Sequence, residues 1–292
     1  MTERRDQTLR ASVDAGATPE RGASLIARAR SSSSGSARPL VIGNIALSFH
    51  AAAAAVTALT IERHGLATSA IAAPHEQMFA MLDRGEVDLL VTAWLPASHG
   101  RYLEPQAHKI RKLAVLYRPY CIWGVPDTVP AAEVASVTDL ARPEVAAGFR
   151  KRIQGIGEGA GISRFSRAII ASYGLDRLGF HFENGSLEDC AGAFEEAVGA
   201  GERCIVPLWH PQFLHHRHRI RELAEPKGLL GGVDDAVLLI REEVADRLDP
   251  AVLDALTQLH IGNETLAMLD YAINREDLTA REAAARWLAE AG

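Results

Sequence analysis

The sequence predicts an α/β fold built as two lobes in tandem, with a cleft between them. Short apolar runs alternate with helical segments over residues 40–94, and the alternation restarts after a proline-containing region at 119–130. Strand, helix, strand order with short connections is typical of a parallel sheet covered by helices. A chain of 292 residues, 48% of them hydrophobic, is long enough to fill two such cores.

Apolar runs and helix-breaking residues set the expected elements. Gly65 and Gly174 follow helical segments at the position where a left-handed residue ends a helix, and Pro74 suits a first helical turn. The expected strands are 40–46, 67–73, 87–94, 153–156 and 204–208. The expected helices are 50–64, 74–84, 162–173, 187–200, 250–260, 263–274 and 279–291, with a helix entry at 136–140.

The order of these elements sets the expected lobes. We expect lobe one at 39–125 together with about 233–292, and lobe two at 126–232. Residues 1–38 contain several arginines and a serine run but no apolar segment of a secretory signal, and this composition predicts a disordered tail. The pair Arg4-Arg5 is found in twin-arginine export signals, but no apolar segment follows it here.

Charge, cysteine content and hydropathy exclude several classes of protein. The net charge is −6 and no long basic run occurs, so nucleic acid is not an expected partner. Three cysteines without a CxxC pair do not make a disulfide framework, and we expect Cys121, Cys190 and Cys204 to be buried as small apolar residues. No run approaches the roughly 20 apolar residues of a membrane span.

Two of the four tryptophans stand at the carboxyl ends of predicted strands. Trp94 and Trp209 each end an apolar run, and in both cases a proline follows two residues later. Ligands of open α/β sheets bind beyond the carboxyl ends of strands, so both indoles are expected to face the cleft. An indole face attracts a quaternary ammonium by roughly 0.5 to 2 kcal/mol. The alternative is that each tryptophan only packs against the end of its sheet.

A glycine-rich segment, 155–163, joins a predicted strand to a predicted helix. Free backbone N–H groups at such a helix start can hold an anion, either a phosphate or a carboxylate. The segment lacks the dinucleotide fingerprint and the lysine of a P-loop, so a plain tight turn is the alternative. His99, five residues after Trp94, is placed to donate to a ligand carboxylate.

A histidine group and the search for a nucleophile bear on enzymatic function. The group comprises His210, His215, His216 and His218. No zinc motif accompanies it, and Arg217 and Arg219 would repel a cation, so we expect a solvated basic helix face and no metal or cofactor. No GxSxG elbow or Ser-xx-Lys occurs, and we predict that the chain is not an enzyme.

Five segments together resemble motifs of one family in order and spacing. They are 85–88 (GEVD), 93–102 (AWLPASHGRY), 159–162 (GAGI), 208–211 (LWHP) and 223–228 (LAEPKG). They are similar to motifs of the glycine betaine, proline betaine and carnitine/choline substrate-binding proteins of ABC transporters, over about residues 40–288. The resemblance implies a periplasmic-binding-protein-like fold of type II, whose two lobes are joined by a hinge.

The resemblance also implies roles for individual residues. Trp94 and Trp209 would clasp a trimethylammonium group from opposite lobes. The backbone N–H groups of Gly161 and Ile162, with the side chain of His99, would hold a carboxylate.

One position departs from the family pattern. Relatives typically bring a third tryptophan from the end of the first strand, where this chain has Leu47. Leucine has no ring quadrupole, so the affinity for a quaternary ammonium is expected to fall by about 0.5 to 2 kcal/mol unless Phe49 takes its place. The other aromatic residues considered as substitutes are Tyr102, Tyr120 and Trp123, the last of which we expect to pack between the lobes.

By this resemblance the chain captures a betaine, carnitine or choline type of small molecule and presents it to an ABC permease subunit at the membrane. No bond is made or broken, and closure occurs at a hinge. The resemblance implies a periplasmic or membrane-associated protein, while the absence of a visible signal peptide leaves a cytoplasmic location open. The alternatives are a cytoplasmic ligand sensor and an enzyme that uses the same two-lobed fold.

Overall fold

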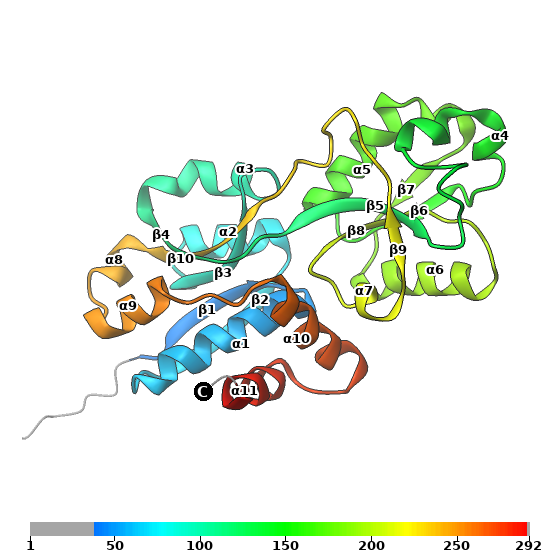
Figure 1. Ribbon diagram of the computed structural model, residues 1–292. Coiled ribbons are helices and arrows are strands. Elements are labelled where there is room, and N and C mark those ends of the chain that lie inside the picture. Colours follow the sequence, from blue (N-terminus) through cyan, green and yellow to red (C-terminus); the bar gives the residue numbers. More distant parts are fainter. Residues whose placement is uncertain (1–37, 291–292) are drawn as a thin grey trace, which may run out of the picture. The chain divides into compact units, whose positions relative to one another are not determined.

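The computed structural model describes residues 38–290, which form two main sheets and the helices that cover them (Figure 1). The strands are β1 (Leu40–Ile45), β2 (Thr68–Ala73), β3 (Leu89–Leu95), β4 (Ile110–Tyr117), β5 (Tyr120–Pro126), β6 (Arg152–Gln154), β7 (His181–Glu183), β8 (Val206–His210), β9 (Ile220–Glu222) and β10 (Asp235–Arg241). The α-helices are α1 (Ser48–Arg63), α2 (His75–Asp83), α3 (Gly100–Leu103), α4 (Pro143–Ala146), α5 (Gly161–Ser172), α6 (Leu187–Gly199), α7 (Leu214–Arg217), α8 (Glu242–Ala245), α9 (Pro250–Thr257), α10 (Asn263–Arg275) and α11 (Ala280–Glu290). Three 3-10 helices are η1 (Glu104–Lys109), η2 (Val137–Ala141) and η3 (Leu175–Leu178). The expected strands and helices are all present with slightly shifted ends.

The first sheet is mixed, whereas the sequence predicted a parallel one. Its order is β2-β1-β3-β10-β4; β1 runs parallel to β2 and β3, but β10 runs antiparallel to both β3 and β4. Neither β4 nor β10 was expected. Strand β10 pairs with residues more than a hundred positions earlier in the chain. A local alternation of strands and helices therefore cannot predict it.

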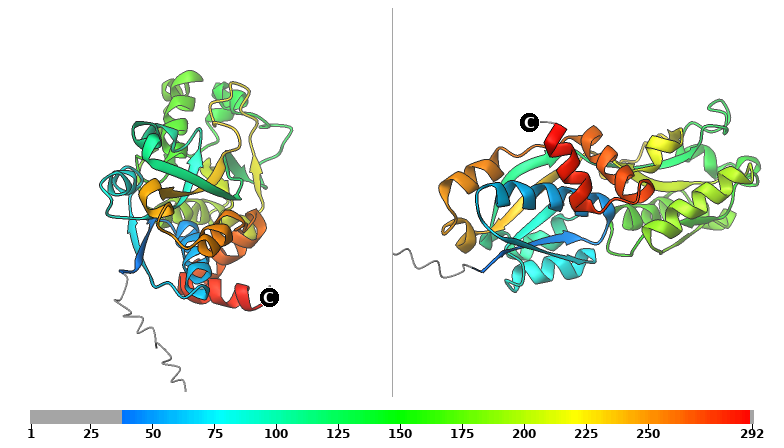
Figure 2. Two further views of the ribbon diagram at one scale, coloured as in Figure 1. Left: turned by 90° about the vertical axis from the view of Figure 1, so that its left-hand side faces the viewer. Right: turned by 90° about the horizontal axis from the view of Figure 1, so that it is seen from below.

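Helices cover both faces of this sheet. Helix α1 packs on β1, β2 and β3, and α9, α10 and α11 pack on α1 in turn (Figure 1, Figure 2). Helix α2 belongs to a separate hydrophobic cluster on the other face. Gly43 in β1 makes this approach possible, because a Cβ atom there would lie 2.5 Å from the sulfur of Met78 in α2.

The second sheet has the order β8-β5-β9, and the short parallel pair β6-β7 lies in the same half of the chain. Strand β5 occupies part of the proline-containing region at 119–130, for which no strand was expected. It pairs with β8 and β9, so the change from one sheet to the other falls before Tyr120, in front of the expected lobe boundary at about residue 125. The lobe limits stay a prediction.

The chain passes between the two sheets twice, once between β4 and β5 and once before β10. The two crossing segments are bonded to each other: the backbone N–H of Asp234 donates to the carbonyl of Pro119 at 2.8 Å, and Tyr120 forms an isolated β-bridge with Val233. Paired crossing segments of this kind are candidates for the expected hinge.

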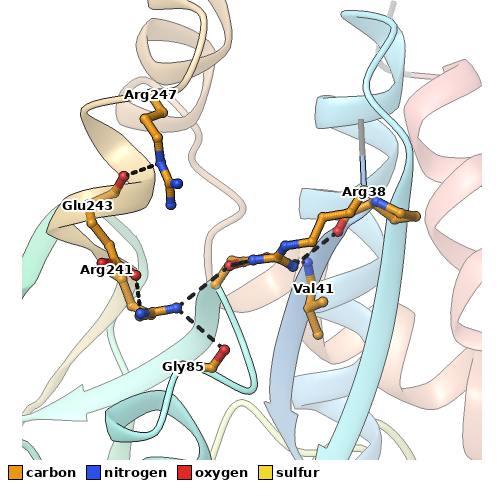
Figure 3. A network of polar contacts seen from close by, with 8 residues as sticks. Arg38, Val41, Gly85, Arg241, Glu243 and Arg247 are labelled. Atoms are coloured by element: carbon orange, nitrogen blue, oxygen red, sulfur yellow. Dashed lines mark hydrogen bonds and ion pairs between the residues drawn. The ribbon is translucent and has the colours of Figure 1, made fainter. Parts of the chain in front are cut away.

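A buried carboxylate fixes the start of the described chain. The side chain of Asp88, in the GEVD segment, is inaccessible to solvent and accepts two hydrogen bonds from Arg38, at 2.8 and 2.6 Å, and one from the backbone of Val41 (Figure 3). The Arg241 guanidinium lies near the same carboxylate and contacts the carbonyl of Gly85. The contacts of Asp88 thus join the start of β1 to the end of β10.

Three expectations concern single features of the chain. The disordered tail at 1–38 falls, apart from Arg38, outside the described residues. Within 38–290, no helix is both long and apolar enough to cross a membrane. All three cysteines are buried, as predicted.

Candidate functional site

A pocket is lined by residues from both halves of the described chain. Its lining residues are Leu47, Phe49, His50, His75, Trp94, Ser98, His99, Cys121, Ile156, Ala160, Gly161, Ile162 and Trp209. Those from the first half lie at or just after the carboxyl ends of the parallel strands β1, β2 and β3, which share one edge of the sheet. Those from the other half stand on β5 and β8 and around the turn between β6 and α5.

Three aromatic rings form one wall of the pocket. Phe49 contacts both indoles, with ring centroids 5.4 Å from Trp94 and 5.6 Å from Trp209. Leu47, immediately before α1, lines the same pocket and is only partly buried. The two strand-end tryptophans therefore come together from different sheets, and Phe49 rather than Leu47 supplies the ring beside them.

The indole N–H groups of the two tryptophans have different surroundings. Trp94 Nε1 donates to the hydroxyl of Tyr117 at 2.9 Å, which fixes the orientation of its ring. Trp209 Nε1 is buried without a hydrogen-bond partner among the described residues. An indole N–H donates only, so this group suits an acceptor atom that enters the pocket.

His99 is held as a neutral hydrogen-bond donor. Its Nδ1 accepts the backbone N–H of Trp94 at 2.9 Å. Burial lowers the pKa of His99 well below its usual range, and the nearby His75, His50 and Arg164 act in the same direction. A neutral imidazole whose Nδ1 accepts must carry its proton on Nε2. That N–H can donate to a ligand oxygen.

The start of α5 forms the opposite part of the pocket. Gly161 and Ile162 are its first two residues, and the backbone N–H groups of a first helical turn have no partner within the helix. Ser98 packs against this turn, and a Cβ atom on Gly161 would lie 2.7 Å from Ser98 Oγ. The Ser98 hydroxyl is itself buried without a partner among the described residues. Hydrogen-bond donors thus gather at this end of the pocket.

Arg164 and Asp234 hold the two halves of the pocket together. The Arg164 guanidinium, on α5, donates to the carbonyl of Ser98 at 2.6 Å and to that of Gly159 at 2.7 Å. The Asp234 carboxylate accepts the backbone N–H groups of Ala97 and Ser98 at 2.7 and 3.1 Å. The 93–102 segment is therefore fixed by one of the crossing segments and bonded to α5.

Sequence reasoning missed two histidines of the pocket. His50 follows β1 on the first turn of α1, and His75 follows β2 as the first residue of α2. Burial lowers the pKa of His50 well below its usual range and that of His75 to about 4, so both are neutral at neutral pH. The signal that could have found them is the one used for Trp94: both follow carboxyl ends of predicted strands.

The other aromatic candidates lie outside the pocket lining. Tyr102 donates to the carbonyl of Gly159 at 3.0 Å, and Tyr120 stacks on His210. Trp123 is fully buried against α5, where its Nε1 donates to Ser166 Oγ at 2.8 Å. The ring of Trp123 therefore packs on α5, and its expected place between the lobes stays a prediction.

The histidine group at 210–218 was expected to form a solvated basic helix face, and it is only partly exposed to solvent. His216, Arg217 and Arg219 are exposed. His215 instead stacks on His210, with ring centroids 3.6 Å apart, and burial lowers its pKa to about 4. The difference arises because α7 is only one turn long and His215 lies against the end of β8, with its Nε2 3.2 Å from the carbonyl of Trp209.

The pocket lining combines aromatic faces and hydrogen-bond donors. Its side chains include no aspartate and no glutamate. Arg164 adds positive charge close by, since it contributes to the lowered pKa of both His75 and His99. The arrangement suits a ligand with a diffuse cation at the aromatic wall and an anionic group at the donor end.

Comparison with known proteins agrees with the expected fold and family. The model of the substrate-binding domain of ABC-type glycine betaine transport systems matches residues 38–290. The glycine betaine/L-proline-binding protein ProX of Borrelia burgdorferi superposes with a TM-score of 0.77 at 21% identity, covering 86% of this chain and 92% of that one. Lactococcal OpuAC, closed on glycine betaine, also has a TM-score of 0.77 at 21% identity, covering 87% and 96%.

A choline-binding protein of an ABC transporter, in complex with choline, has a TM-score of 0.75 at 15% identity, covering 86% of this chain and 87% of that one. No match to this chain was found among curated protein sequences. The structural neighbours confirm the two-lobed α/β fold class, and the family match extends over all the described residues. The chain therefore belongs to the family of substrate-binding domains of ABC-type glycine betaine transport systems.

Proposed function

We propose that this chain captures a betaine, a quaternary ammonium that also carries a carboxylate, and delivers it to an ABC permease. The observation that carries the proposal is that Trp94 and Trp209, from different sheets, line one pocket whose far end holds hydrogen-bond donors. A trimethylammonium group offers no donor and is bound by ring faces, while a carboxylate accepts from N–H groups. In this assignment the cation binds against the rings of Trp94, Trp209 and Phe49. Leu47 adds an apolar contact.

The donor end is assigned to the carboxylate. His99 Nε2 and the backbone N–H groups of Gly161 and Ile162 point to this role, since each is a donor at the pocket without an internal partner among the described residues. The neighbours support the same ligand class, since one is a glycine betaine/L-proline-binding protein and another is complexed with glycine betaine. A third is complexed with choline, but the absence of carboxylates from the lining here favours a ligand that brings its own.

Binding would proceed by closure of the two halves around the ligand. The ligand would later be released without chemical change. The closed form would then dock on the membrane-embedded permease, on the side from which the transporter takes up its ligand. Enzymatic turnover is the alternative. Incubation with glycine betaine followed by proton NMR tests it, and we expect the ligand spectrum to stay unchanged.

The test of the cage is calorimetric titration of the full chain with glycine betaine, using Trp94→Ala and Trp209→Ala. We expect each variant to bind at least about tenfold more weakly than wild type, since each loses one ring face from a dry pocket. Trp287→Ala, on α11 and remote from the lining, is the matched control and should bind like wild type. Equal affinities in wild type and both pocket variants would refute the cage.

A further inference from the structure

His50 is buried at the pocket, and its ring lies close to both Trp94 and His99. The centroid of the His50 ring lies 5.6 Å from that of Trp94 and 6.3 Å from that of His99, and only 1% of the His50 surface is exposed. His50 stands three residues after Leu47, at the start of α1, and lines the pocket. None of the roles assigned above uses it.

A chain of buried hydroxyl groups connects His50 to Trp94. Trp94 Nε1 donates to the Tyr117 hydroxyl at 2.9 Å, which lies 2.8 Å from Thr92 Oγ1. Thr92 Oγ1 in turn lies 3.0 Å from His50 Nδ1. The connecting residues Tyr117 and Thr92 are themselves buried, at 1% and 0% exposure.

Only one direction of donation along this chain leaves no buried hydroxyl proton unpaired. The Tyr117 oxygen already accepts from Trp94, and the acceptor for its proton among the described residues is Thr92. Thr92 then accepts from Tyr117, so its own proton goes to His50 Nδ1. In the reverse direction the Tyr117 proton would have no acceptor, which costs free energy in a buried site.

This hydrogen-bonded chain from Trp94 through Tyr117 and Thr92 to His50, called the relay below, therefore fixes the tautomer of His50. With Nδ1 as an acceptor, the neutral ring carries its proton on Nε2, and this atom has no hydrogen-bond partner among residues 38–290. His99 is locked in the same tautomer by the backbone of Trp94. Two neutral imidazoles beside Trp94 thus each keep an Nε2–H donor.

We infer that His50, held by the Trp94–Tyr117–Thr92 relay, is a second imidazole donor to the anionic group of the ligand and a determinant of selectivity for betaines over quaternary ammonium alcohols. The inference rests on the proposed function. It assigns to the relay the task of keeping a donor, rather than an acceptor, directed at the ligand. It also couples the cation wall to the anion end, because the indole that contacts the cation orients the imidazole that contacts the carboxylate.

The decisive experiment measures the affinity of the full-length protein for two ligands, glycine betaine and choline, which share the trimethylammonium group but differ in the carboxylate. In His50→Phe we expect glycine betaine to bind about 10- to 100-fold more weakly, since a hydrogen bond to a charged group is lost. Choline should lose threefold or less, as an order-of-magnitude estimate, because its hydroxyl gains little from the donor.

The relay is tested separately with Thr92→Val, which replaces the hydroxyl by a methyl group of similar shape. The ring of His50 is then free to adopt the other tautomer, so glycine betaine affinity should fall while choline affinity is kept. Thr57→Val is the matched control, because Thr57 is equally buried and its hydroxyl donates to the Ala53 carbonyl within α1. Long-range ¹H–¹⁵N correlation spectra of the unliganded protein should report a protonated His50 Nε2 in wild type and a changed pattern in Thr92→Val.

The outcomes are distinguishable. If the wild type binds neither ligand, the proposed function fails and this inference with it. If the wild type binds glycine betaine but His50→Phe weakens both ligands equally, or neither, His50 is not the selective donor and only this inference is overturned. A His50 ring protonated on Nδ1 in the unliganded wild type would also overturn it.

Discussion

Asp270 carries a buried carboxylate whose direct partners are hydrogen-bond donors rather than a paired cation. It accepts hydrogen bonds from Ser48 Oγ, from the Asn274 side chain and, at 2.9 Å, from the backbone N–H of Phe213. Burial nevertheless raises the pKa of Asp270 to about 6, because these bonds and the more distant Arg275 do not offset the loss of hydration. The residue links α10 to the segment that follows Trp209.

The pH dependence of stability follows from this shift. The carboxyl of Asp270 releases its proton near pH 3.8 in the unfolded state but only near pH 6 in the folded state. Protonated Asp270 therefore contributes stability at low pH, and this contribution is lost as the pH rises from about 4 to 6. The contribution lost is about 3 kcal/mol. We expect urea unfolding of Asp270→Asn to lack this decrease, whatever its absolute stability. An unchanged difference between the free energies of unfolding at pH 4 and pH 7 would contradict the assignment.

Helix α5 is the element that carries the donor end of the pocket. Its first residue has to be glycine for the two halves to approach, because a Cβ atom there would lie 2.7 Å from Ser98 Oγ and 2.9 Å from Ser98 Cβ. Arg164, one turn later, then reaches the carbonyl of Ser98. Close packing and hydrogen bonding thus both depend on the start of one helix.

Gly161→Ala tests this dependence. We expect glycine betaine affinity to fall at least about tenfold, because a Cβ atom 2.7 Å from Ser98 Oγ forces the helix start or the Ser98 segment to move and so misplaces the donors. The same overpacking should lower the free energy of unfolding by about 1 to 3 kcal/mol. Gly192→Ala is the matched control: it also lies in a helix, and nothing stands within 4 Å of its new Cβ atom. That variant should bind like wild type and gain about 0.5 to 1 kcal/mol in stability. Wild-type affinity in Gly161→Ala, measured by calorimetry, would show that the close contact is not required.

At the scale of the whole molecule, contacts far from the pocket also join the two halves. Arg275, at the end of α10, pairs with Glu195 of α6 at 3.1 Å and packs over the ring of Phe213 at 4.5 Å. Helix α10 packs on α1, whereas α6 contacts β6 and β8. The pair therefore links a helix packed on α1 to a helix packed on β6 and β8, and we expect it to contribute to holding the two halves together.

Arg275→Met is expected to weaken glycine betaine binding about two- to fivefold through faster dissociation, with little change in the association rate. Arg286→Met serves as the control, since Arg286 pairs with Glu276 among the carboxyl-terminal helices. Stopped-flow measurement of indole fluorescence separates the two rates. A change confined to association would argue against a role in holding the closed form.

The sequence by itself determined the alternating elements, the two strand-end tryptophans and the glycine-rich helix start. These are local features: strand length, helix ends and turn residues depend on neighbours in the chain, and the position of Trp94 or Trp209 at a strand end follows from them. The position of His99 after Trp94 predicted its donor role, and the family resemblance added the roles of Gly161 and Ile162; all three stay predictions for the ligand contacts.

Only the tertiary structure decided which residues share the pocket. The antiparallel insertion of β10 between β3 and β4 depends on pairing across more than a hundred residues, which no local pattern encodes. The same holds for His50 and His75, whose environment is set by burial against other elements, and for the relay from Trp94 through Tyr117 and Thr92. The donor direction of that relay is fixed by which buried protons find an acceptor, and this is a property of three-dimensional packing alone.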